Sequence, residues 1–459
     1  MNRLPHPISA PCRLLRTLFL LPLLLGPLAS AAGRTPETEP CDYNHRFARP
    51  LGEVLRTLEA RFGIRIDCRG FDADTLRLPY ADSRLRPYSL EESLDNIVRS
   101  LDLKWSHRDG VKYRIEPYEY YRRTYADGER LLAWLSGLCD DRAAWERRRE
   151  QLLGEARAML DMQPLYDSLV AAPRVQLGPL RKYDGYTVQT YALETLPGVM
   201  VCGAVYAPAG KVRGKRPLIV SPAGHWPEGR MRPDQQYRMA TFARMGAVAV
   251  DLDIVGWGAG ARTVPFPHED PRSMRLQALW SKAVTDWVVA TRTDVDTTRM
   301  AATGGSGGAT HTLLLALQDA RFTVLAPVVH LVAHFDGGCP CESGVPVTTV
   351  GGGSCTTELL AAVAAPRPLL TVSDGGDWTT TYPASEYPFL RRIWDFYGAG
   401  ERVENAHFPD QRHDYGPDKR QAVYDFFART LGLDASRADE SKVTLLPAAA
   451  LELLGTDGE

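Results

Sequence analysis

Residues 299–317, "RMAATGGSGGATHTLLLAL", place the run Gly304–Gly308 between a short apolar stretch and a longer one. The run is either a serine in a flexible glycine loop or the pattern Gly-x-Ser-x-Gly at a sharp strand-to-helix turn. Such a turn strains the backbone of Ser306, and side chains two positions away would clash with the strand or the helix, which glycine avoids. We therefore predict a strand, then a nucleophilic Ser306, then a helix whose first N–H, that of Gly307, faces an oxyanion.

A serine needs a general base to act as a nucleophile. Downstream, "RPLLTVSDGGDWT" places Asp377 just after a predicted strand, and "NAHFPDQRHDYGPDKR" places His413 in a loop before the last predicted helix. The order serine, acid, histidine is the one that a sheet-based hydrolase uses. Ser306, Asp377 and His413 are therefore the predicted triad, in which the histidine takes the serine proton and the carboxylate orients the ring.

The sequence leaves alternatives at two of these positions. Asp374 lies directly at the strand end, and Glu342 lies in "HFDGGCPCESG" after the preceding strand, so either can replace Asp377 as the acid. Asp377 is favoured because a few loop residues are needed to turn a carboxylate back toward the histidine. His407 ends a strand in "VENAHFP" and is expected to be structural.

The stretch "LIVSPAGHWPEGR" is the predicted source of the second oxyanion donor. Gly224 permits a close backbone approach, and the N–H of His225 or Trp226 can then point at the substrate oxygen. Trp226 and Trp378 flank the predicted oxyanion loop and the predicted acid. An exposed indole stacks on a sugar ring, so Trp378 is a candidate substrate-binding residue.

Other side chains near these loops suggest specificity or metal binding. Arg230, like Arg232, follows the oxyanion loop and is a candidate for binding a uronate carboxylate. The nearby residues that suggest zinc are Cys339, Cys341, Cys355, His330 and His334. The C-x-C spacing lacks a second matched pair and a serine triad needs no metal, so no metal or cofactor is predicted. A disulfide from Cys355 to one of the pair is favoured instead.

The first residues have the features of an exported protein. Three arginines precede "TLFLLPLLLGPL" and the small-residue stretch "ASAAG", so residues 1–31 are a predicted signal peptide cleaved after Ala31. The protein is therefore expected in the periplasm or outside the cell. The formal net charge of −2 gives no indication of a nucleic-acid partner.

The 459 residues are enough for two domains. Residues 45–117 predict a small α+β domain: a helix from Leu51 ending at Gly63, a second helix capped by Ser89, and a hairpin turning at Asp109-Gly110. Residues 118–180 predict a helical linker in which Asp141 caps a long helix. From 181 to 433, apolar strands alternate with helices, which predicts an α/β domain with a mostly parallel sheet covered on both faces. A tail, residues 434–459, follows.

The predicted catalytic region resembles the α/β-hydrolase superfamily, and more narrowly the bacterial acetyl xylan esterase-like carbohydrate esterases. The similarity lies in "SPAGHWPEGR", "DLDIVGWGAG", "DVDTTRMAATGGSGGATHT", "PRPLLTVSDGGDWT" and "RHDYGPDKR". It implies a serine esterase that removes acetyl or methyl groups from plant polysaccharide through an acyl-enzyme. A general lipid or aryl esterase and a peptidase on the same fold are the alternatives.

Residues 45–117 resemble the short N-terminal domain of secretins and TonB-dependent receptors in the order of their predicted helices and strands. That resemblance implies contact with an envelope protein partner. It also leaves open a protein that acts mainly as an envelope adaptor, although the intact triad argues against that function.

Overall fold

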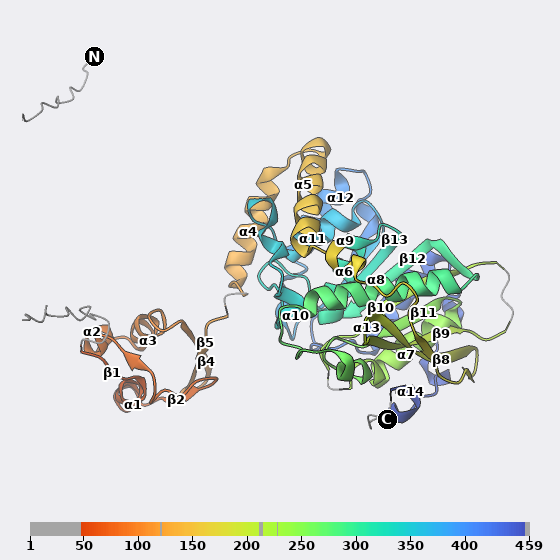
Figure 1. Ribbon diagram of the computed structural model, residues 1–459. Helices are drawn as coiled ribbons and strands as arrows, with labels where there is room; N and C mark the ends of the chain where they lie inside the picture. Colours follow the sequence, from red (N-terminus) through yellow and green to blue (C-terminus); the bar gives the residue numbers. More distant parts are fainter. Residues whose placement is uncertain (1–46, 120–121, 211–213, 227, 455–459) are drawn as a thin grey trace, which may run out of the picture. The chain divides into compact units, whose positions relative to one another are not determined.

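The computed structural model describes residues 47–119, 122–210, 214–226 and 228–454 (Figure 1). The described chain divides into two compact units, with the division between Tyr118 and Glu119. The predicted signal peptide, residues 1–31, lies outside the described residues. Within the described part of the chain, no helix combines the length and the apolar character that crossing a membrane requires.

The smaller unit is an α+β fold with its own apolar core. Its three-stranded sheet has the order β2-β5-β4, and β1 pairs with β3 in a separate ribbon. Helix α1 ends at Gly63, whose φ of 66° is the left-handed conformation that glycine adopts readily. The Ser89 hydroxyl accepts the Glu92 N–H and caps α3, as predicted. The elements are β1 (Arg49–Pro50), α1 (Leu51–Phe62), β2 (Arg65–Cys68), β3 (Arg77–Leu78), α2 (Ala81–Arg84), α3 (Leu90–Val98), β4 (Leu103–Asp109) and β5 (Lys112–Pro117).

The larger unit contains a ten-stranded sheet in the order β15-β14-β13-β12-β10-β11-β9-β8-β6, with β7 pairing with β8. The strands from β10 to β15 are parallel, and the β9 side of the sheet is antiparallel. The strands are β6 (Val175–Leu177), β7 (Arg181–Lys182), β8 (Tyr186–Leu196), β9 (Val199–Pro208), β10 (Arg216–Pro222), β11 (Val248–Leu252), β12 (Val295–Gly305), β13 (Phe322–Val328), β14 (Leu369–Asp374) and β15 (Val403–Phe408).

Helices cover both faces of this sheet (Figure 1). The apolar side chains of α5, α8, α9, α11 and α12 share one core with the sheet, and those of α7 and α13 share a second core on the opposite face. The predicted α/β architecture is therefore confirmed. The helices are α4 (Tyr125–Leu138), α5 (Arg142–Leu160), α6 (Gln163–Asp167), α7 (Pro233–Met245), α8 (Ser273–Thr291), α9 (Gly307–Gln318), α10 (Pro340–Ser343), α11 (Thr356–Ala364), α12 (Glu386–Asp395), α13 (Pro417–Leu431) and α14 (Ala448–Leu451).

The segments expected to be linker and tail are built into the larger unit. Helix α5 begins after Asp141, which accepts the Ala144 N–H at 2.7 Å as its predicted cap. Arg148 on α5 forms a buried ion pair with Glu358 on α11, with an Nε–Oε1 distance of 3.0 Å. In the tail, the Leu451 side chain is fully buried. Both segments therefore pack on the sheet-containing core.

Candidate active site

Ser306 lies at the sharp turn between β12 and α9. Its φ of 55° and ψ of −125° are strained for a residue with a side chain. A Cβ at position 304 would overlap the Gly308 carbonyl oxygen, and a Cβ at position 308 would lie 2.5 Å from the Pro222 oxygen. Only glycine fits at these two positions, so the predicted strand–turn–helix arrangement is present.

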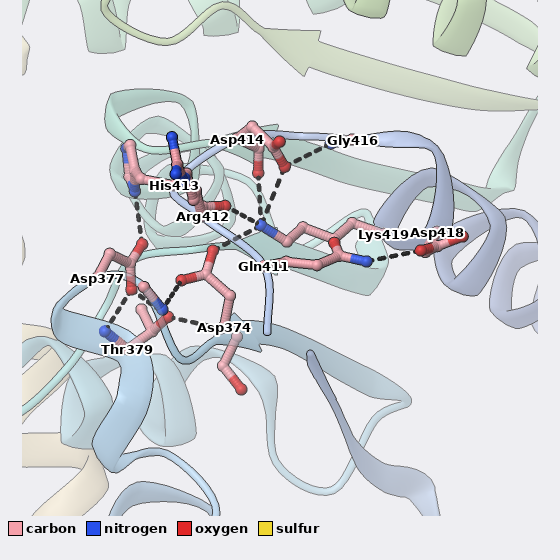
Figure 2. Close-up of polar contacts among 12 residues, drawn as sticks. Asp374, Asp377, Thr379, Gln411, Arg412, His413, Asp414, Gly416, Asp418 and Lys419 are labelled. Carbon is pink, nitrogen blue, oxygen red and sulfur yellow. Dashed lines mark hydrogen bonds and ion pairs between the residues drawn. The ribbon is translucent and has the colours of Figure 1, made fainter. Parts of the chain in front are cut away.

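Asp377 and His413 lie together beyond the ends of β14 and β15 (Figure 2). The His413 Nδ1 is 2.5 Å from Asp377 Oδ2. The other carboxylate oxygen of Asp377 accepts hydrogen bonds from the Thr379 N–H at 2.6 Å and the Thr379 hydroxyl at 2.5 Å. Burial raises the pKa of Asp377, but the hydrogen bonds from His413 and Thr379 outweigh it and hold that pKa below its ordinary value. The carboxylate is therefore ionised and fixed in place.

The other two acids that the sequence allowed have different partners. Asp374 forms a fully buried ion pair with Lys419, at 2.5 Å from Nζ to Oδ2 (Figure 2). Glu342 accepts the Gly338 N–H and lies 3.2 Å from His225 Nδ1. Among the described residues, Asp377 is the acid that contacts His413.

The remaining histidine that the sequence singled out lies on β15. His407 Nδ1 is 2.9 Å from the Ser373 hydroxyl of the neighbouring strand. This contact belongs to the pairing of β14 with β15, in agreement with the structural role expected for His407.

A pocket of about 360 Å³ opens over Ser306. Its wall includes His225, Trp257, Phe335 and Trp378. The Trp378 ring lies 4.5 Å from the His413 ring between centroids, and its indole N–H donates to His330 at 3.2 Å. Trp378 therefore presents an aromatic surface to the pocket while it supports His413.

The loop after β10 lies against the serine turn. A Cβ on Gly224 would overlap both the Gly305 carbonyl oxygen and the Trp226 ring, so this close approach requires glycine. The Trp226 N–H already donates to the Gly224 oxygen at 3.0 Å. A Cβ on Gly307 would lie 2.5 Å from His225 Cε1, so the His225 ring covers the start of α9. Among the described residues the His225 N–H donates to no backbone acceptor, so of the two predicted donors in this loop it is the one available to a substrate.

The prediction that Arg230 binds a substrate carboxylate is wrong. Its side chain is 1% exposed and pairs with Asp253 at 2.8 Å. It also donates to the Leu451 carbonyl oxygen in the tail. Sequence alone does not reveal this role, because Asp253 and Leu451 are distant along the chain. Arg232 instead lies over the Trp226 ring, with its guanidinium carbon 4.7 Å from the ring centroid.

The cysteines near the pocket also differ from expectation. Cys339, Cys341 and Cys355 are all free thiols, so the favoured disulfide to Cys355 is wrong. Cys339 and Cys341 instead lie beside two imidazoles, those of His225 and His268, and the four donor atoms are all within 4.8 Å of one another. The sequence placed His330 and His334 with the cysteines, but these two do not belong to this group. No local spacing links His225 and His268 to a C-x-C pair, so only the fold reveals the cluster.

A mixed, mainly parallel sheet with helices on both faces and a strained serine between a strand and a helix define an α/β-hydrolase. A scan against protein-family models and a search of curated proteins found no match. Among solved structures, Methylesterase BT1017 is similar, with 50% identity, a TM-score of 0.83, and coverage of 89% of this chain and 91% of its own. At that identity and coverage the chain belongs to the family of this methylesterase, and it is an esterase.

Other solved structures are less similar to this chain. The glucuronoyl esterase from Solibacter usitatus has 13% identity and a TM-score of 0.46, over 64% of this chain and 94% of its own. The acetyl xylan esterase from Paenibacillus sp. R4 has 19% identity and a TM-score of 0.40, over 61% and 93%. These likenesses are too low to add to the assignment, which depends on the methylesterase.

Proposed function

We propose that the protein hydrolyses small ester groups on plant cell-wall polysaccharide through an acyl-enzyme on Ser306, with methyl esters of sugar carboxylates as the leading class. The observation that carries this proposal is the paired Asp377 and His413 together with a strained Ser306 that lines a pocket. The 50% identity to a methylesterase favours methyl over acetyl groups. Trp378, on the pocket wall, offers a surface on which a sugar ring stacks.

In the proposed reaction, His413 acts through Nε2, because Asp377 holds Nδ1. Oγ of Ser306 attacks the ester carbonyl carbon and its proton passes to His413. The carbon–methoxy bond then breaks, and the proton leaves with the alcohol as methanol. Water loses a proton to His413 and attacks the acyl-enzyme; the bond from the acyl carbon to Oγ of Ser306 then breaks, His413 returns the proton to Oγ, and the sugar acid is released. The N–H groups of Gly307 and His225 stabilise the oxyanion formed in both steps.

Two further assignments follow from the sequence. The predicted signal peptide supports export to the periplasm or the cell exterior, where polysaccharide is encountered. The resemblance of the smaller unit to envelope-protein domains supports a protein partner for that unit. Pull-down with the full chain and with residues 119–459 tests this partner, since only the full chain should retain it.

The test is product release from methyl-esterified and acetylated polysaccharides. The wild-type protein should release methanol faster than acetate, and Ser306→Ala should lower the rate by at least about a thousandfold. Ser168→Ala, which changes an exposed serine of the same unit, is the control and should leave the rate unchanged. Full methanol release by Ser306→Ala would overturn the mechanism, and release of acetate alone would overturn the choice of ester.

A further inference from the structure

Four side chains of the kinds that bind metals lie close together beside Ser306: His225, His268 and Cys339, which line the pocket, and Cys341. His225 Nε2 lies 2.8 Å from the Cys341 sulfur and 3.1 Å from the Cys339 sulfur. His268 Nε2 lies 3.3 Å from the Cys339 sulfur. The two sulfurs are 3.1 Å apart, far beyond the roughly 2.0 Å of a disulfide bond. The four donor atoms therefore lie within 4.8 Å of one another, and the two sulfurs are not joined by a covalent bond.

Both histidines are held in the orientation that a metal ligand adopts. His225 directs its other ring nitrogen, Nδ1, to Glu342 Oε1 at 3.2 Å. His268 directs Nδ1 to the Val255 carbonyl oxygen at 2.6 Å. An acceptor at Nδ1 keeps the proton there and leaves the Nε2 lone pair free toward the cluster. Metal-ligating histidines in proteins almost always have such a carboxylate or carbonyl partner.

We propose that Cys339, Cys341, His225 and His268 bind one zinc ion. Two thiolates and two imidazoles are a ligand set that tetrahedral structural zinc favours. The two thiolate charges balance the charge of the ion, which suits a site where Cys341 is fully buried and His268 nearly so. With four protein ligands the zinc has no open position for water or substrate, so its role is structural.

The ligands come from three segments that are separate in the sequence. His225 follows β10, His268 precedes α8, and the two cysteines lie at the start of α10. The zinc therefore ties these segments together beside the serine turn, where the His225 ring already covers Gly307. The ion therefore fixes the loop whose His225 N–H stabilises the oxyanion, a role that rests on the proposed function.

Metal analysis of the purified full chain tests the site without using activity. After zinc loading and dialysis, the wild-type protein should contain about one zinc ion per chain. His268→Ala and Cys341→Ser should lower this content by about tenfold or more. His268→Cys supplies a replacement thiolate and should keep the zinc, which separates lost ligation from lost packing. Cys68→Ser, in the smaller unit, is the matched control and should keep it too.

Several results would overturn the site. The proposed site is overturned if wild-type protein retains no stoichiometric zinc after loading, and this result does not depend on whether the variants fold. An intact mass two hydrogens lighter than the thiol form, with Cys339 and Cys341 joined by a disulfide, would also overturn it. With cobalt in place of zinc, the wild-type protein should show the absorption of a tetrahedral cobalt thiolate, and its absence would also count against the site.

The positioning role has its own readout. Removing zinc from the wild-type protein with a chelator should lower kcat for methyl ester hydrolysis, with a smaller change in KM, and restoring zinc should recover kcat. An unchanged kcat in zinc-free protein would overturn this role and leave the binding site standing. Ser306→Ala should lose hydrolysis yet keep its zinc, so failure of the proposed function and failure of the metal site are distinguishable.

Discussion

At the scale of single residues, the strained backbone of Ser306 requires that positions 304 and 308 carry no side chain. A methyl group on Gly304 would overlap the Gly308 carbonyl oxygen. We therefore expect Gly304→Ala to displace the serine and to lower kcat/KM by about a hundredfold, the effect of a misplacement of about 1 Å. Steady-state hydrolysis of a methyl ester measures this change.

The control for that substitution is Gly154→Ala, in the middle of α5. Apart from the adjacent residues and the backbone of α5 itself, no atom lies within 4 Å of the added methyl group there. We expect unchanged kinetics and a gain in unfolding free energy of up to about 1 kcal/mol, because alanine favours a helix over glycine. Equal loss of activity in both variants would show that the steric argument at position 304 is mistaken.

Substitutions of Asp377 and Asp374 should affect different properties, the first mainly activity and the second mainly stability. Asp377→Asn removes the carboxylate that orients His413 and is expected to lower kcat by about 10⁴-fold with little loss of stability. Asp374→Asn removes the fully buried carboxylate paired with Lys419, which then keeps only the half-exposed Asp414, and is expected to destabilise the fold by about 1.5–3 kcal/mol. Hydrolysis rates and urea unfolding of both variants measure the two effects. A stable but inactive Asp374→Asn would instead make Asp374 the catalytic acid.

At the scale of elements, local patterns predicted most of the fold. The strand and helix around Ser306, the capped α3 and α5, and the turn at Asp109-Gly110 all depend on residues close together in the sequence. The group of two cysteines and two histidines beside the pocket and the ion pair of Arg230 with Asp253 could not be predicted in this way. Each depends on how loops from distant parts of the chain come together, and neither hydrophobic periodicity nor residue spacing in the sequence predicts such contacts.

The attachment of α5 to the sheet-containing core gives a prediction at this scale. Arg148 on α5 pairs with Glu358 on α11 and donates to the carbonyl oxygens of Gly351 and Gly353. Arg148→Ala leaves the buried Glu358 carboxylate without its counter-charge, with the Ser354 hydroxyl still donating to it, and removes the donor to both carbonyls. We therefore expect a loss of about 3–5 kcal/mol. Arg147→Ala, at an exposed site on the same helix, should change stability by less than about 0.5 kcal/mol. Similar unfolding curves for the two variants would contradict this account of the helix.

At the scale of the whole molecule, buried histidines make the stability of the fold depend on pH. Burial, and then the nearby Arg122, lowers the pKa of His334 to about 4 from an ordinary value of 6.5. Its Nε2 has no hydrogen-bond partner among the described residues, so the folded protein holds this ring neutral. Burial also lowers the pKa of His311, to about 3. Below about pH 6.5 the unfolded chain therefore binds protons that the folded chain does not.

The sign of the pH effect follows from that difference in bound protons. Stability falls as pH decreases wherever the unfolded state binds more protons, so His334 should destabilise the fold progressively from about pH 6.5 down to about pH 4. One such group contributes at most about 1.4 kcal/mol per pH unit. Urea unfolding of the wild type and His334→Asn across this range measures it: the variant should gain stability relative to the wild type as pH falls. Above about pH 7.5 the difference between them should be constant, since neither state then protonates the ring. A difference that is constant through the acid range as well would mean that His334 is not held neutral by the fold.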